Sequence, residues 1–149
     1  MKKSILIEIL SSFSRKEMKE FSEYIISPFF NKNQSLIRLY NFLRIKYPEF
    51  NKEEVEKKTV FSELYPGIKY NDGFMRTLIF GLSAQAENYL SYIRCKSSFY
   101  KDKTFLLYEL NDRQLDRHLE KNLKLVSKKL EAEKVRDNEY FLDKYNLEN

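Results

Sequence analysis

The sequence predicts an all-α protein, and three observations support this prediction. Apolar residues recur at helical spacing along most of the chain, most clearly over residues 75–93. All glycines and prolines lie between residues 28 and 81, so residues 82–149 contain neither of the two strongest helix breakers. Helix-capping motifs coincide with the starts of several apolar repeats. We therefore expect about seven helices packed as antiparallel neighbours, an arrangement that would also suit the start of an α-solenoid.

Length and composition are those of one folded domain. The chain has 149 residues, of which 42% are hydrophobic and 33% charged, enough to build a core and to solvate its surface. We expect a single helical domain over residues 1–149, with a helical bundle at 1–97 and a helix-pair extension at 98–149 as its possible subdivision. The formal net charge of +5 is a mild basic bias, which permits nucleic-acid binding without indicating it.

The first two helices are expected on either side of Ser14. Residues 5–13 carry an apolar repeat with helical spacing. Ser14 and Glu17 match a capping box, in which the hydroxyl and the carboxylate each accept from a free backbone N–H. Pro28 disfavours helical geometry just before it, so the second helix should end near Ile26.

The segment SPFFNKN follows this helix at residues 27–33. Asn31 or Asn33 can cap the third helix. At least one of Phe29 and Phe30 is expected to plug the junction between the two helices, because soluble domains seldom leave adjacent large apolar residues exposed. The alternative is that both form an exposed anchor for a partner.

Two later segments combine a proline with an asparagine. The segments are YPEFN, residues 47–51, and LYPGIKYND, residues 64–72. In each segment the proline should end one helix and the asparagine, Asn51 or Asn71, should start the next. Gly81 lies in the middle of an apolar stripe, where a glycine indicates a close helix crossing.

The rest of the chain also has helical patterns. We expect TFLLYEL, residues 104–110, to be helical, and residues 115–130 to form an amphipathic helix. Apolar residues between 140 and 147 form a face that ends at Asn149 without a terminating signal. The expected partner is therefore another protein or further helices of a longer chain.

SPFFNKN, LYPGIKYND, Arg76 and the apolar stripe to Leu90 resemble the amino-terminal region of a group of uncharacterised bacterial (Bacteroidota-like) proteins. The resemblance covers residues 8–93. It implies a helical protein that often continues into further helix pairs. It carries no activity and names no functional residue.

Several classes of function lack the residues that they need. One His and one Cys cannot form a zinc-finger site, and the scattered glycines provide no phosphate-binding loop. Cys95 and His118 have no visible orienting group for nucleophilic catalysis, so we expect no enzyme, metal or cofactor. With a single cysteine and no apolar run of membrane-spanning length, we expect a cytoplasmic protein that does not enter a membrane.

The predicted function is a non-enzymatic helical module for protein–protein interaction or scaffolding. Its candidate contact residues are the large aromatic side chains at two breaks between helices. They are Phe29, Phe30, Tyr92, Phe99 and Tyr100.

The alternative function is nucleic-acid binding. Residues 52–90 resemble the helix pair of a helix-turn-helix or winged-helix regulator, with 104–110 as a strand of the wing. Residues 92–103 interleave aromatic and basic side chains, and residues 113–128 place a basic ridge opposite an apolar stripe. The candidate contacts are Arg76, Arg94, Lys96, Lys101, Lys103, Arg113, Arg117, Lys121, Lys124 and Lys128.

Overall fold

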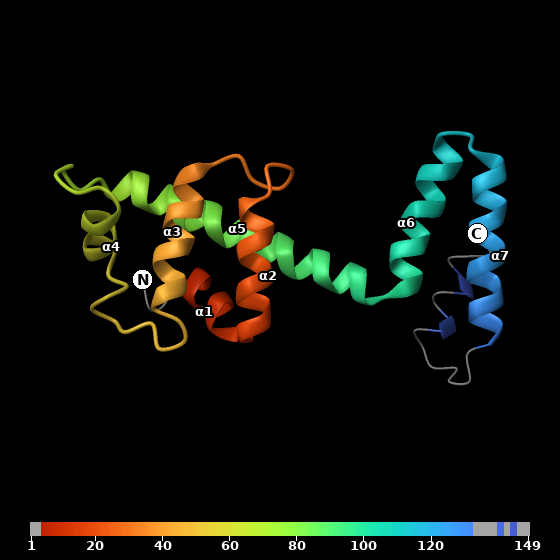
Figure 1. Ribbon diagram of the computed structural model, residues 1–149, viewed down its shortest axis with the longest axis horizontal. Coiled ribbons are helices and arrows are strands. Elements are labelled where there is room, and N and C mark those ends of the chain that lie inside the picture. The colour runs from red at the N-terminus through yellow and green to blue at the C-terminus, as the bar shows by residue number, and fades with distance from the viewer. Residues whose placement is uncertain (1–3, 133–139, 142–143, 146–149) are drawn as a thin grey trace. The chain divides into compact units, whose positions relative to one another are not determined.

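The computed structural model describes residues 4–132, 140–141 and 144–145, and within them it contains seven α-helices and no strand (Figure 1). The all-α prediction is confirmed. The helices are α1 (Ile5–Ser12), α2 (Arg15–Ile26), α3 (Gln34–Ile45), α4 (Lys57–Leu64), α5 (Asp72–Ser97), α6 (Phe99–Asp112) and α7 (Asp116–Glu131). The chain divides into two compact units, Met1–Ser91 and Tyr92–Asn149, with the boundary inside α5 and near the subdivision considered at residue 97.

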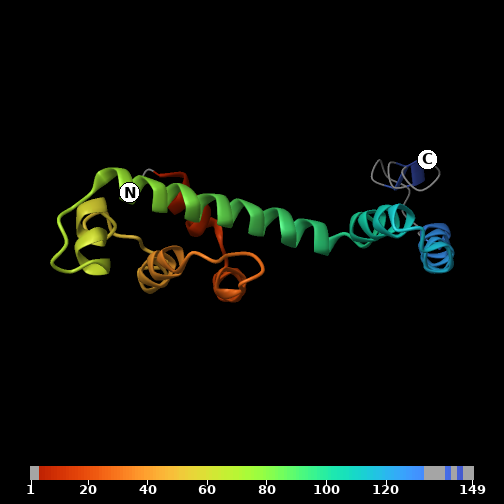
Figure 2. The same cartoon turned by 90° about the horizontal axis from the view of Figure 1, so that it is seen from above.

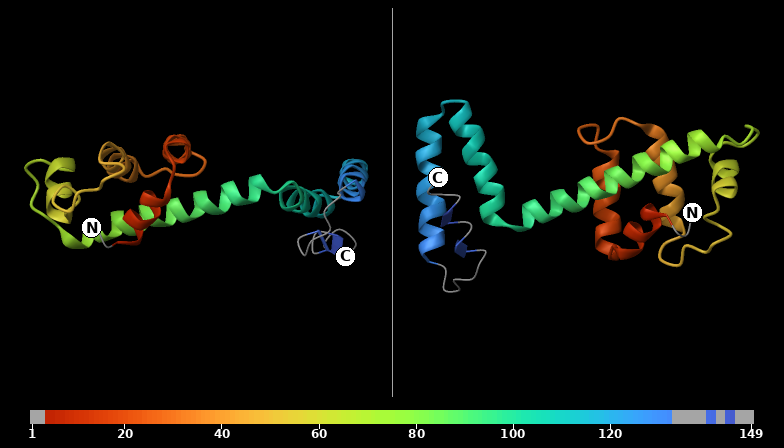
Figure 3. Two further views of the ribbon diagram at one scale, coloured as in Figure 1. Left: turned by 90° about the horizontal axis from the view of Figure 1, so that it is seen from below. Right: turned by 180° about the vertical axis from the view of Figure 1, so that it is seen from behind.

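In the first unit, α2 and α3 are antiparallel neighbours, and α5 crosses both of them on one side (Figures 2 and 3). The crossing is close at Gly81. A Cβ atom at this position would lie 3.2 Å from Cδ2 of Leu36 on α3, so a larger residue would require Leu36 to shift. This confirms the prediction that Gly81 marks a helix crossing.

Aromatic rings fill the centre of the first unit. Phe21 is fully buried, and its ring centroid lies 4.9 Å from that of Tyr40 and 5.3 Å from that of Tyr89. Both hydroxyls have partners, since Tyr40 donates to the carbonyl of Met18 and Tyr89 donates to the carboxylate of Glu20 at 3.1 Å. Burial raises the pKa of Tyr40 to about 12, because the charged phenolate is poorly solvated in the core.

Two of the predicted helix starts are confirmed. The backbone N–H of Ser14 donates to Glu17 Oε2 at 2.7 Å, and the N–H of Glu17 donates to Ser14 Oγ at 3.2 Å, which completes the capping box of α2. At the start of α5, Asn71 Oδ1 accepts from the N–H of Phe74 at 2.9 Å. The caps thus supply acceptors for N–H groups that have no partner within the helix.

The predicted helix start at Asn51 is wrong. The Asn51 side chain donates to Glu54 Oε2 at 3.0 Å instead of capping a backbone N–H, and the next residues form turns. Helix α4 begins only at Lys57. The apolar residues on either side of this motif, Phe50 and Val55, are both buried, so their spacing fits a packed turn as well as a helix start.

The segment between α2 and α3 is organised by its two asparagines. Helix α2 ends at Ile26 as predicted, and Asn33 Oδ1 accepts from the N–H of Ser35 at 2.9 Å, so Asn33 is the cap of α3. Asn31 is buried, donates its amide to the carbonyl of Ile25 at 2.9 Å and accepts from the N–H of Asn33 at 2.9 Å. Asn31 therefore holds the turn together.

In the second unit, α6 and α7 form an antiparallel pair. The helix predicted for residues 104–110 is confirmed as part of α6. Gln114 has a φ of 56° and turns the chain between the two helices. The buried core of this unit contains Tyr100, Leu107, Val126, Leu130 and Tyr140.

Candidate functional site

An apolar groove on the first unit is formed by the start of α1, the start of α4 and one face of α5. It encloses about 360 Å³. Phe80 and Ile5 are its large exposed apolar side chains, since 76% of Phe80 and 62% of Ile5 are accessible to solvent. The other lining residues are Ser4, Lys57, Arg76, Ile79, Ser83, Ala84 and Glu87.

The local structure explains why the groove is open at α1. Ser4 caps this helix by accepting from the N–H of Ile7 at 3.4 Å, which places Ile5 at the first position of α1. Leu6, Ile7 and Leu10 face the core and are buried. Ile5 lies outside that buried face and remains on the surface.

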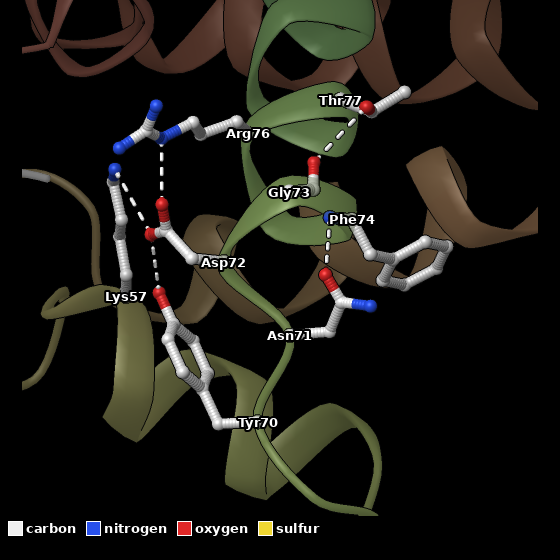
Figure 4. Close-up of polar contacts among 8 residues, drawn as sticks. All are labelled: Lys57, Tyr70, Asn71, Asp72, Gly73, Phe74, Arg76 and Thr77. Carbon is white, nitrogen blue, oxygen red and sulfur yellow. Dashed lines mark hydrogen bonds and ion pairs between the residues drawn. The ribbon is translucent and has the colours of Figure 1, made fainter.

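A polar cluster borders the groove at the start of α5, and Figure 4 shows Asp72 at its centre. Asp72 Oδ1 accepts from the hydroxyl of Tyr70 at 2.8 Å and lies 3.6 Å from Lys57 Nζ, while Oδ2 lies 2.7 Å from Arg76 Nε. The hydrogen bond from Tyr70, followed by the two cations, lowers the pKa of Asp72. Arg76 is thus positioned by Asp72, and the cluster connects α4 with α5.

The predicted plug residues Phe29 and Phe30 differ in burial. Phe29 is 88% exposed. Phe30 is half-buried and stacks on Tyr24 of α2 with 4.3 Å between ring centroids, while its carbonyl accepts from Gln85 Nε2 of α5 at 3.3 Å. The structure therefore places Phe30, and not Phe29, against the helices.

The aromatic and basic side chains of residues 92–103 do not form a free stacking surface. Tyr100 is buried in the second unit, and the ammonium group of Lys129 lies 3.6 Å from the ring centroid of Phe99. Lys96 Nζ is 2.5 Å from Asp102 Oδ1, and this hydrogen bond raises the pKa of Lys96. Tyr92 and Arg94 are exposed on α5, whereas Lys101 and Lys103 are half-buried on α6.

The basic ridge is exposed as expected, but its membership is corrected. Arg113 follows the end of α6 and pairs with Glu109 on that helix, with Nε 3.0 Å from Oε2. Helix α7 begins at Asp116 with Leu115 as its N-cap residue, close to the predicted start, and Arg113 lies outside this helix. The members of the predicted ridge that lie exposed on α7 are Arg117, Lys121, Lys124 and Lys128.

The winged-helix form of the nucleic-acid alternative lacks its wing. Residues 104–110 are helical, and no strand occurs in the part of the chain that the structure describes. Residues 65–71 separate α4 from α5, a longer connection than the three to four residues of a helix-turn-helix. The described residues contain no group of three His, Cys, Asp or Glu side chains that could hold a metal ion.

The apolar groove was not predicted from the sequence. The residue that could have indicated the groove is Phe80. It lies about 140° around the helix from Met75, on the side opposite the buried stripe of α5. A single exposed aromatic residue is common on protein surfaces, and it indicates a contact surface only where other exposed apolar residues adjoin it, as Ile5 does here. Ile5 gave no such signal, because it continues the apolar repeat of the first helix.

No family model matches the chain, and neither a curated protein nor a solved structure matches it. Among the described residues, none of the helices is both long enough and apolar enough to cross a membrane.

Proposed function

We propose that the chain is a non-enzymatic helical module for protein–protein interaction or scaffolding, and that its partner binds in the apolar groove of the first unit. The observation that carries this proposal is the groove itself, with Phe80 76% exposed beside Ile5 at 62%. Burying one such side chain contributes roughly 1.5–3 kcal/mol. An exposed aromatic residue in a concave apolar site is also the type of residue that dominates binding energies at interfaces.

The shape and charge of the groove favour one kind of occupant. Its α5 wall runs from Arg76 to Glu87, about three helical turns, a length suited to a short amphipathic helix. Lys57 and Arg76 lie toward one end of that wall and Glu87 lies at the other. Asp72 pairs with both cations, which leaves one net positive charge at that end. The occupant is therefore an amphipathic helix with an acidic residue near Lys57 and Arg76 and a basic residue near Glu87.

Nucleic-acid binding remains the second candidate. The observation that favours it is the exposed row Arg117, Lys121, Lys124 and Lys128 on α7, beside a hollow of about 630 Å³ lined by three of these residues. Glu120 also lines the hollow, and an acid within the row opposes phosphate binding. We therefore place this function second.

Site-specific photocrosslinking tests the first candidate. A photoreactive residue replaces Phe80 in cells that naturally express the chain. The control carries it at Phe29, which is even more exposed but lies outside the groove. We expect one protein to crosslink through position 80 and not through position 29. Crosslinking to nucleic acid, or equal protein crosslinking at both positions, would contradict the proposal.

The affinity of that purified protein provides the second measurement. Phe80→Ser should weaken its binding at least tenfold, because the aromatic contact with the groove is lost, whereas Phe29→Ser should leave the Kd unchanged. The affinity should also depend weakly on salt. A steep linear fall of log affinity with log salt, as phosphate contacts produce, would support the second candidate instead.

A further inference from the structure

A second concave site lies on the first unit, between the start of α2 and the end of α3. It encloses about 380 Å³. Three of its lining side chains are cationic, and the other three contribute apolar atoms. The residues are Arg15, Lys19 and Arg44, with Met18, Tyr47 and Pro48.

The three cations converge from two helices. Arg15 and Lys19 are four residues apart on α2, so they lie on one face of that helix. Arg44 comes from the last turn of α3, where its Nη1 donates to Ser22 Oγ at 3.1 Å. That bond orients the guanidinium and leaves most of its five N–H donors available for a ligand.

The acids near the site do not neutralise these cations, because two of them are bound elsewhere and two others, Glu23 and Glu49, form no ion pair with Arg15, Lys19 or Arg44 among the described residues. Glu17 accepts from the N–H of Ser14 in the capping box, and Glu20 accepts from Tyr89 and pairs with Lys16. Within the described chain, Arg15, Lys19 and Arg44 form no ion pair, and no carboxylate lines the site. The site therefore has three uncompensated positive charges.

The remaining walls are apolar and fixed in place. The hydroxyl of Tyr47 donates to the carbonyl of Phe13 at 2.6 Å, which holds the ring beside the site, and Met18 is buried beneath it. The three cations are solvent-exposed, so their attraction for an anion should depend on the salt concentration. The apolar walls provide a contact for an apolar group attached to that anion.

We propose that this pocket binds a phosphate monoester whose phosphate contacts Arg15, Lys19 and Arg44 and whose apolar or aromatic group lies against Tyr47 and Pro48. A monoester has a charge of about −1.5 to −2 and three acceptor oxygens, which match three cations better than a single carboxylate does. Guanidinium groups bind phosphate through paired N–H donors. A volume of about 380 Å³ is that of a small-ligand pocket. This site shares no residue with the apolar groove, so it does not depend on the proposed function.

Calorimetric titration of the full chain with phenyl phosphate, inorganic phosphate and phenol tests this proposal. Phenyl phosphate should bind with a stoichiometry of one and more tightly than inorganic phosphate, because it also contacts the apolar wall. Phenol, which lacks the anion, should not bind. The affinity of phenyl phosphate should fall as salt is added.

Charge-removing variants locate the binding. Arg44→Gln and Lys19→Gln should each weaken phenyl phosphate binding about tenfold, since each removes a charge-assisted contact. Arg38→Gln is the matched control, because it removes the same charge from an exposed position of α3 outside the pocket. Circular dichroism verifies that each variant is folded. Ser22→Ala should weaken binding without any change of charge, because it frees the Arg44 guanidinium.

Two further ligands distinguish the sources of a phosphate monoester. O-phosphotyrosine and a peptide containing phosphotyrosine should both bind, and tighter binding of the peptide would assign the ligand to a phosphorylated protein side chain. Equal binding would assign it to a free small molecule. Absence of phenyl phosphate binding overturns the proposal, and so does an equal loss of affinity in Arg38→Gln and Arg44→Gln.

Discussion

The two units are both helical, but their interiors are built differently. In the first unit, rings from α2, α3 and α5 surround Phe21, and both core tyrosine hydroxyls have partners. In the second unit, α6 and α7 share a narrower apolar strip, and a Lys129 ammonium covers the half-buried ring of Phe99. Helices thus enclose a large aromatic core in the first unit. In the second unit they enclose a smaller core, and a surface cation covers an aromatic ring at its edge. Substitutions of equally buried residues should therefore lower the free energy of unfolding by different amounts in the two units.

The largest expected effect is at the centre of the first unit. Phe21→Ala should lower the free energy of unfolding by about 3–5 kcal/mol, because it leaves a cavity among rings that cannot collapse fully. Urea denaturation followed by circular dichroism measures this change. A loss below about 1 kcal/mol would show that the aromatic cluster is not tightly packed.

The second unit offers the matching change. Leu130→Ala should cost about 2–4 kcal/mol, toward the lower part of the range for buried leucines, because fewer side chains surround it. Amide hydrogen exchange should accelerate in α6 and α7 and stay unchanged in α2 and α3. Equal acceleration in both regions would mean that the two cores open as one.

Alkaline pH should destabilise the first unit in particular. Burial raises the pKa of Tyr40 to about 12 from an ordinary value near 10, and burial together with Glu20 raises the pKa of Tyr89. The folded state thus favours neutral tyrosine. The contribution of Tyr40 to the free energy of unfolding is therefore complete below about pH 10 and is lost as the pH rises through about 12. The loss should be on the order of 2 kcal/mol for Tyr40.

Melting temperatures between pH 8 and 12 measure this effect, and Tyr40→Phe is the control. The variant should start from a lower Tm, because the hydrogen bond to Met18 is absent, but its Tm should fall less at high pH. Identical slopes for the two proteins would contradict the assignment to Tyr40.

A smaller effect is expected from the cation over Phe99. Lys129→Gln should reduce stability by about 0.5–1 kcal/mol, the usual range for an exposed cation–π contact, whereas Lys129→Arg should retain most of it. Thermal unfolding of both variants provides the comparison. If the Lys129→Gln and Lys129→Arg variants have the same stability, the charge above the Phe99 ring does not contribute to it.

The smallest effect is expected on the basic face of α7. Reversing both Arg117 and Lys124 to Glu should change stability by less than about 0.5 kcal/mol, because both side chains are solvated. We also expect no measurable nucleic-acid binding by the intact protein near physiological salt. Micromolar binding of RNA or DNA that disappears in the double variant would instead promote the nucleic-acid function.

Most of the fold was predictable because its signals are local. Ser14 and Asn71 start helices through bonds within three residues, and Gly81 marks a crossing because no other residue in its stripe lacks a side chain. Asn51 has the same sequence signature as Ser14. Its side chain pairs with Glu54, which in turn binds Lys46, and no local rule favours this arrangement over a cap.

The candidate sites were less predictable because they depend on tertiary proximity. Arg113 fits the helical projection of the basic ridge, but the turn at Gln114 places it with α6. The groove combines α1 with α5, and the phosphate pocket combines α2 with α3. Periodicity shows which face of each helix is polar. It does not show which exposed faces adjoin one another across the chain.

The cluster at the start of α5 also affects how the chain ages. Asp72 precedes Gly73, and in such a pair the glycine nitrogen can attack the side-chain carbonyl carbon of the aspartyl residue, which expels water and forms a succinimide. Hydrolysis of the succinimide at its other carbonyl then gives isoaspartate. The attack requires a protonated carboxyl group and a backbone free to bring the nitrogen close. Here Tyr70, Arg76 and Lys57 hold the carboxylate ionised, and the helix fixes the backbone. Isoaspartate should therefore form in proportion to the fraction of time for which this first helical turn is open, so its accumulation reports the stability of that turn.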